Sequence, residues 1–132
     1  MTTFIVNFDG GTRDQINGYG SWEVRWQGFS KKVSRTPYEA RKFGQRITSN
    51  VAEYLALTGA LAWLQSVKNK DRYRIVIYGD SELVLKTLTG EHIIHKAHLK
   101  PLRDTCREFL KGFADWKTEW QGRAHNVARF GH

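Results

Sequence analysis

The order of strand-like and helical patterns most constrains how this chain can fold. Strand-like segments alternate apolar and polar residues or form short apolar runs, whereas helical segments repeat their apolar residues every three to four positions. Strand-like patterns occupy residues 3–8, 22–26, 29–35, 73–78 and 116–120, and helical patterns occupy residues 51–68, 81–88 and 101–111. A three-strand meander, followed by strands reached through helical crossovers, predicts an α/β fold with a mixed sheet flanked by helices.

Turn and capping residues predict where several elements begin and end. The first strand is expected to stop at residues 9–11, where Asp-Gly-Gly favours a tight turn. Asn50 is expected to be the N-cap of the helix at residues 51–68, and a truncated helix is expected after Asn126. Residues 37–46 show no clear period, so irregular or short extended structure is expected there.

Chain length and charge set the domain count and the class of partner. The 132 residues are enough for one hydrophobic core but not for two, so residues 1–132 are expected to form a single domain. Lys and Arg number 21 against 13 Asp and Glu, which gives a formal charge of +8. Such an excess favours a polyanionic partner, above all nucleic acid, although a basic surface can also serve solubility alone.

Cys106 is the single cysteine, and it excludes an intramolecular disulfide. It lies on an apolar helical stripe, where a buried structural thiol is expected rather than a nucleophile. The chain starts without an apolar signal segment, and no apolar run approaches the roughly 20 residues that a membrane span needs. We therefore expect a cytoplasmic monomer with no membrane contact.

Two aspartates follow apolar strands. Asp9 and Asp80 each come directly after such a run, and a right-handed crossover between the two strands would bring both carboxylates to one edge of the sheet. Each aspartate also has a structural interpretation. Asp9 and Gly10 form a common turn pair, and Asp80 or Ser81 can cap the following helix.

Glu53 is the more informative acid because apolar residues follow it at helical spacing and place it on the core-facing stripe. These residues are Ala56, Leu57, Ala60, Leu61 and Leu64. A capping box with Asn50 would explain Glu53 structurally. An inward-facing glutamate near two strand-end aspartates is instead what a metal site with oxygen ligands requires, since clustered carboxylates repel one another without a cation.

Three segments resemble the catalytic motifs of type 1 ribonuclease H, in the same order and at similar spacing. They are residues 8–11 (FDGG), 47–57 (ITSNVAEYLAL) and 77–81 (IYGDS), and the second is distinctive. The resemblance implies a ribonuclease H-like fold with a five-stranded mixed sheet. It also implies an endonuclease that uses two Mg²⁺ ions, replaceable by Mn²⁺, to cut the RNA strand of RNA–DNA hybrids and leave 5′-phosphate and 3′-hydroxyl ends. Asp9, Glu53 and Asp80 are the implied metal ligands and catalytic residues.

The chain departs from the family at its fourth acid, usually an aspartate that opens a C-terminal helix. No Asp or Glu follows Arg123. Asn126 is best placed at the start of the last helix, so we assign it the fourth catalytic and metal-binding position, although an Asn there can also be an N-cap. The alternative alignment puts Phe130 at that position and leaves three ligands. No role is assigned to His125.

The resemblance also implies contacts to the hybrid. Backbone groups at Gly10 and Gly11 and the side chains of Ser49 and Asn50 match positions that touch the RNA strand, where the 2′-hydroxyl distinguishes RNA from DNA. Thr48 resembles a residue that helps to hold a phosphate of the DNA strand. Polar residues near a helix start can equally be caps. Because residues 89–98 lack a basic insertion, binding is expected to rely on dispersed Lys and Arg.

Alternatives remain at the level of function. Another nuclease or a strand transferase of the same fold would share the clustered acids, and a hybrid-binding module with a weakened active site would explain a missing fourth acid. His92, His95 and His98 recur every three residues, but no cysteine or carboxylate accompanies them at a zinc-finger spacing. We therefore expect them to lie beside the substrate groove.

Overall fold

The computed structural model describes residues 2–132 and contains one five-stranded sheet in the order β3-β2-β1-β4-β5. β1, β2 and β3 are joined antiparallel, whereas β1 pairs with β4, and β4 with β5, in parallel. The strands are β1 (Thr2–Thr12), β2 (Asn17–Trp26), β3 (Phe29–Glu39), β4 (Tyr73–Gly79) and β5 (Asp115–Trp120). This arrangement confirms the predicted α/β fold with a mixed sheet.

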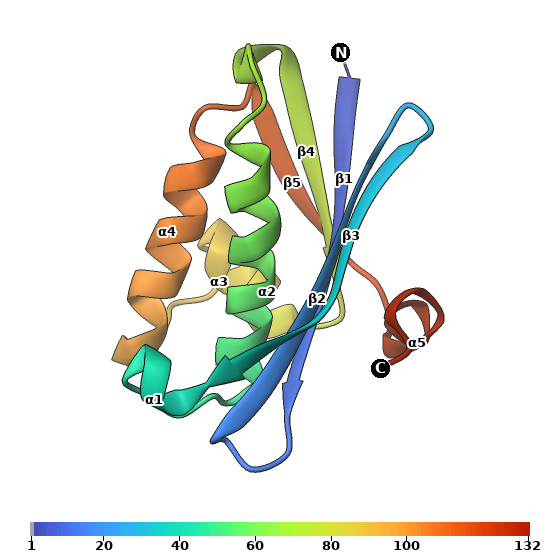
Figure 1. Ribbon diagram of the computed structural model, residues 1–132. Helices are drawn as coiled ribbons and strands as arrows, with labels where there is room; N and C mark the ends of the chain where they lie inside the picture. Colours follow the sequence, from blue (N-terminus) through green and yellow to red (C-terminus); the bar gives the residue numbers. More distant parts are fainter. Residues whose placement is uncertain (1) are drawn as a thin grey trace.

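Helices cover the two faces of the sheet unequally. α2, α3 and α4 lie together on one face, and α5 lies on the other side of the strands, beside the C-terminus (Figure 1). The helices are α1 (Ala40–Phe43), α2 (Ser49–Leu64), α3 (Glu82–Thr89), α4 (Lys100–Leu110) and α5 (Arg123–Phe130), with single 3₁₀ turns at Lys70–Arg72 and Ala97–Leu99. No helix among residues 2–132 is long and apolar enough to cross a membrane.

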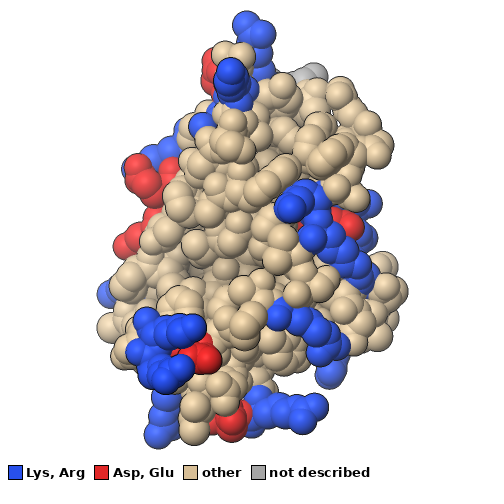
Figure 2. All heavy atoms as spheres, viewed as in Figure 1, with Lys and Arg blue, Asp and Glu red and all other residues tan. Residues whose placement is uncertain are grey.

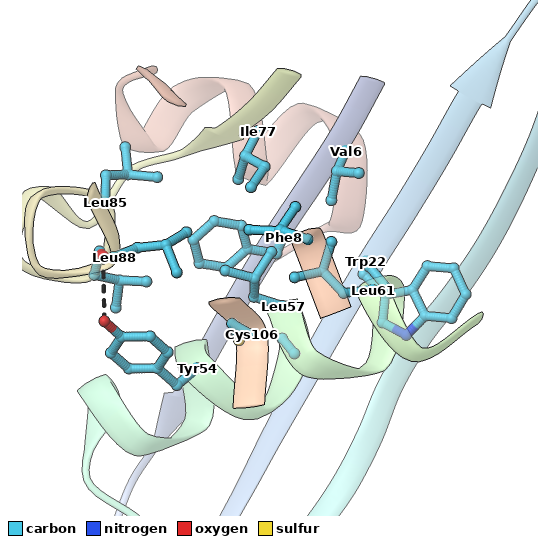
Figure 3. Packing of buried hydrophobic residues seen from close by; sticks show 14 of the residues in the cluster. Val6, Phe8, Trp22, Tyr54, Leu57, Leu61, Ile77, Leu85, Leu88 and Cys106 are labelled. Carbon is cyan, nitrogen blue, oxygen red and sulfur yellow. Dashed lines mark hydrogen bonds between the residues drawn. The ribbon is translucent and has the colours of Figure 1, made fainter. Parts of the chain in front are cut away.

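The main core lies between the sheet and α2. Phe8 of β1 and Ile77 of β4 point toward Leu57 of α2, and Cys106 of α4 belongs to the same cluster of buried residues (Figure 3). Cys106 is fully buried, as expected for a structural thiol, and its Sγ lies 3.3 Å from the Thr58 hydroxyl. Burial raises the pKa of the Cys106 thiol to about 11, which keeps it protonated and unreactive.

α5 is fastened to the opposite face by polar contacts. Arg129 forms an ion pair with Glu23 of β2, and Lys32 of β3 donates to the Arg129 carbonyl. The Arg35 guanidinium donates to the Gly131 carbonyl at 3.3 Å. Because side chains alternate along a strand, the Asp9 side chain lies on the opposite face of β1 from Phe8, the face that carries α5.

The predicted turn at Asp9 was wrong. β1 continues to Thr12, because Gly10 and Gly11 pair with Gly20 and Tyr19 of β2. The turn comes later, where the Asp14 carboxylate accepts the Ile16 and Asn17 amides at 2.9 and 2.8 Å. An Asp-Gly pair favours a turn locally, but the long antiparallel partner strand keeps it extended.

Other boundaries also differ from the prediction. α5 begins at Arg123 with Gly122 as its N-cap, so Asn126 lies inside the last helix and does not open it. β3 runs to Glu39 because buried Tyr38 pairs with Gly18, so part of residues 37–46 belongs to the sheet. The N-cap of α2 is Thr48 rather than Asn50, since the Thr48 hydroxyl accepts the Val51 amide at 3.2 Å. A capping box between Asn50 and Glu53 is therefore not formed.

Candidate active site

Three different elements carry the predicted acids to one end of the sheet. Asp9 lies in β1 just past the last parallel pair, Asn7 with Tyr78, and Asp80 directly follows β4. Glu53 lies in the first turns of α2, whose backbone passes against Gly10. Asp9 is 7% exposed and Glu53 is 8% exposed, so both carboxylates are largely withdrawn from water.

The three carboxylates lie close enough to perturb one another. Burial and the Asp80 charge raise the pKa of Asp9 to about 7. Burial and the charges of Asp80 and Asp9 raise the pKa of Glu53 to about 8, against a weaker opposing effect of the Ser81 hydroxyl. Such a cluster binds either protons or a cation, since either relieves the repulsion.

We expect stability in a chelator to fall as the pH rises from about 5 to about 8. The unfolded carboxyls lose their protons near pH 4, whereas folded Asp9 and Glu53 keep theirs up to about pH 7 and 8. The unfolded state therefore binds fewer protons in this window, and the free energy of unfolding should decrease by several kcal/mol, since each unit of pKa difference corresponds to about 1.4 kcal/mol. Urea unfolding at both pH values measures the change. Glu53→Gln should flatten it, and an unchanged slope in that variant would contradict the assignment.

The donor set suits a divalent cation. Glu53 Oε2 and His132 Nδ1 are buried atoms that lack a hydrogen-bond partner among the described residues, and each can offer a lone pair to a cation. Carboxylate and amide oxygens are the ligands that Mg²⁺ and Mn²⁺ prefer. Within residues 2–132, no three His, Cys, Asp or Glu side chains converge tightly enough to form a ready coordination shell. The residues present are thus of the type that binds a divalent cation, but their side chains would have to move closer together to coordinate one.

Asn126 and Phe130, the two candidates for the fourth position, have different surroundings. Asn126 is 1% exposed, and its side-chain amide lies near enough to the Asp9 carboxylate to lower the pKa of that carboxyl, although it does not form an aligned hydrogen bond. Phe130 stacks on His132 with ring centroids 5.9 Å apart, and the Lys32 ammonium lies 5.6 Å from its ring. The structure thus brings Asn126, and not Phe130, beside Asp9.

Sequence reasoning missed His132, which reaches the same carboxylate. Its Nδ1 lies 3.0 Å from Asp9 Oδ2, its Nε2 lies 2.6 Å from Ser21 Oγ, and its ring meets Tyr19 edge-on at 4.7 Å. Burial and the nearby Arg35 charge lower the pKa of His132. No motif contains this histidine. The available signal was the glycine before it, since Gly131 can turn the chain back after a helix.

The predicted hybrid-contacting residues lie around the acids. Gly10 packs on the start of α2, and Gly11 faces the Tyr19 hydroxyl. Ser49 is exposed, and Asn50 lines a cavity of about 710 Å³ between α3 and the segment before α4. His92 and His95 line this cavity and His98 does not, and all three are exposed without forming a metal cluster among the described residues.

The sheet order and its flanking helices define a ribonuclease H-like fold. Residues 30–129 match the model of the family described as Reverse transcriptase-like. The crystal structure of RNase H1 from Halobacterium salinarum aligns with a TM-score of 0.74 at 31% identity, over 94% of this chain and 89% of that one. The chain therefore belongs to the type 1 ribonuclease H family.

One further relative and two further solved structures are also similar to this chain. Ribonuclease HI of Halobacterium salinarum is 41% identical over 81 residues, which are 61% of this chain but only 39% of that protein. LC11-RNase H1, isolated from compost, has a TM-score of 0.76 at 24% identity, over 97% of this chain and 90% of that one. LC11-RNase H1 in complex with an RNA/DNA hybrid has a TM-score of 0.71 at 21% identity, over 95% and 89% of the two chains. At these identities, the LC11 structures support the fold alone.

Proposed function

We propose that the protein is an endonuclease that hydrolyses the RNA strand of RNA–DNA hybrids. The observation that carries this proposal is the meeting of Asp9, Glu53 and Asp80 at one end of the sheet, where the two buried acids have strongly raised pKa values. Membership of the ribonuclease H family supports the reaction class. The solved complex of LC11-RNase H1 with a hybrid gives a relative of the same fold that binds this substrate.

The three acids and Asn126 would form one metal site. Asp80, directly after β4, perturbs both Asp9 of β1 and Glu53 of α2, so the three carboxylates would hold the cations together. Asn126 would add a neutral oxygen beside Asp9. Two bound Mg²⁺ ions, or Mn²⁺ in their place, would supply Lewis acidity at the scissile phosphate. Water would displace the 3′ oxygen of the RNA strand, so the products would carry 5′-phosphate and 3′-hydroxyl ends.

Recognition of RNA would come from groups around Glu53. The exposed Ser49 side chain and half-buried Asn50 stand at the start of α2, where they can reach a 2′-hydroxyl. Gly10 and Gly11 would offer backbone groups to the same strand. The Thr48 hydroxyl accepts the Val51 amide, and its proton remains available to a phosphate oxygen of the DNA strand.

Hybrid affinity is expected to weaken steeply with salt. The net charge is +8, and on the face seen in Figure 2 the Lys and Arg side chains lie in separate groups. Binding would therefore draw on phosphate contacts and on counterion release. The dissociation constant should rise at least about tenfold between roughly 50 and 200 mM salt. Fluorescence anisotropy with labelled hybrid in a chelator, which prevents cleavage, measures it. A salt-independent constant would contradict this mode of binding.

The experiment that tests the function uses three labelled duplexes. Purified protein is incubated with RNA–DNA hybrid, duplex DNA and duplex RNA, each with Mg²⁺, Mn²⁺ or a chelator, and the product ends are mapped. Metal-dependent cutting of the RNA strand of the hybrid alone supports the proposal. Cutting of duplex DNA but not hybrid would indicate another nuclease or strand transferase of this fold. Binding without cutting would indicate a hybrid-binding module.

A further inference from the structure

The backbone after α5 aims His132 back at the sheet. Gly131 has φ 78° and donates its amide to the Val127 carbonyl at 2.9 Å, which ends α5 in a left-handed turn. Arg35 holds the Gly131 carbonyl, and the His132 ring packs against Phe130 and Tyr19. The His132 side chain is therefore only 6% exposed, at the junction of β1 and β2. Packing therefore holds the His132 ring in this position.

The two ring nitrogens of His132 have different partners. Nε2 lies 2.6 Å from Ser21 Oγ, which also accepts the Arg35 amide at 2.8 Å. Nδ1 lies 3.0 Å from Asp9 Oδ2 without the alignment of a hydrogen bond, so it counts among the buried atoms without a partner. The carboxylate oxygen thus lies beside the ring nitrogen rather than in line with it.

This side-by-side placement is the geometry of two ligands that share one cation. Neighbouring ligands about 2.1 Å from an octahedral ion are separated by about 3 Å. A metal-bound imidazole also commonly donates its second N–H to a fixed polar group. Ser21 Oγ is that group when Nε2 carries the proton, and the lone pair of Nδ1 is then free beside Asp9.

We propose that His132 is a metal ligand that binds, through Nδ1, the cation held by Asp9. The proposal rests on the metal-dependent function proposed above and extends it. It gives this chain a nitrogen ligand 3.0 Å from the Asp9 carboxylate, with buried Asn126 also close to Asp9. Nitrogen ligands favour Mn²⁺ and later transition ions relative to Mg²⁺. The site should therefore prefer Mn²⁺ to a greater degree than a site made of oxygen ligands alone.

Electron paramagnetic resonance of bound Mn²⁺ tests this ligand without any turnover. The wild-type protein loaded with Mn²⁺ should show nitrogen coupling in electron spin echo measurements, and the coupling should change on labelling the histidines with ¹⁵N. His132→Gln should abolish the coupling and weaken Mn²⁺ binding about tenfold. His125→Gln is the matched control, because His125 is exposed on α5, and it should retain both properties. Circular dichroism verifies that the variants are folded.

The outcomes separate this proposal from the proposed function. Absence of nitrogen coupling in Mn²⁺-loaded wild type, or its persistence in His132→Gln, would overturn the ligand assignment even where hybrid is cut. Nitrogen coupling lost only in the His132 variant, in a protein that cuts no hybrid, would support the ligand and reject the nuclease. His132→Asp should shift binding preference from Mn²⁺ toward Mg²⁺, and an unchanged preference would also count against the proposal.

Discussion

Neutralising any one of the three clustered acids should lower the rate of hybrid hydrolysis about a thousandfold or more. Asp9→Asn, Glu53→Gln and Asp80→Asn each remove a negative charge while keeping the size of the side chain. Cations that stabilise the transition state contribute several kcal/mol, and a loss of about 4 kcal/mol corresponds to a thousandfold in rate. Initial rates on labelled hybrid at saturating Mg²⁺ measure the effect.

Stability separates a lost ligand from a lost fold. Because Asp9 and Glu53 are buried and repelled by neighbouring carboxylates, Asp9→Asn and Glu53→Gln should unfold at a higher temperature than wild type in a chelator at pH 8. Glu82→Gln is the matched control, since Glu82 is exposed on α3 and forms an i,i+4 ion pair with Lys86 at 3.6 Å. It should keep its rate. Any of the three acid variants that retained a near-normal rate would lose its place in the site.

The order of elements and the approach of the acids could be predicted from the sequence because both depend on local signals. The apolar run of β4 ends at Gly79, and the core stripe of α2 includes Glu53, much as periodicity indicates. The extension of β1 past Asp9 could not be predicted in this way, because it depends on pairing with β2. The N-cap of α2 could not be predicted either. Just before Thr48, Ile47 is fully buried and donates its amide to the Gln15 carbonyl at 2.8 Å, a contact between residues far apart in the chain.

The candidate site was predicted in part for a related reason. Asp9, Glu53 and Asp80 belong to motifs, so each could be found in its own segment. His132 could not, because its proximity to Asp9 depends on the turn at Gly131, the Arg35 contact and the packing of Phe130. Contacts between residues so far apart in the chain leave no spacing to detect. The contacts between α5 and the sheet therefore could not be predicted from the sequence.

Gly10 has a packing role in addition to the backbone contact with RNA expected for it. A Cβ built on Gly10 would lie 2.4 Å from the Ala52 carbonyl carbon and 2.6 Å from the Glu53 amide nitrogen. Both are backbone atoms of α2, so no rotation of a side chain can relieve the contact. The missing side chain of Gly10 is what lets the helix that carries Glu53 approach the strand that carries Asp9.

Gly10→Ala is therefore expected to lower the free energy of unfolding by about 3 kcal/mol or more and to abolish hydrolysis under conditions where the variant is still folded. The added methyl group must push α2 away from β1, which separates Glu53 from Asp9. Urea unfolding and hybrid cleavage, both at low temperature, measure the two effects.

Gly122→Ala is the matched control, because Gly122 has φ −64° and its added Cβ would meet nothing closer than the Trp120 ring at 3.6 Å. Because Gly122 is the N-cap of α5, where Ala is less favourable than Gly, the control should lose at most about 1 kcal/mol of stability and keep its rate. A Gly10→Ala protein with wild-type stability would show that α2 does not need this close approach, and one with a wild-type rate would show that the distance between the two acids is not set by it.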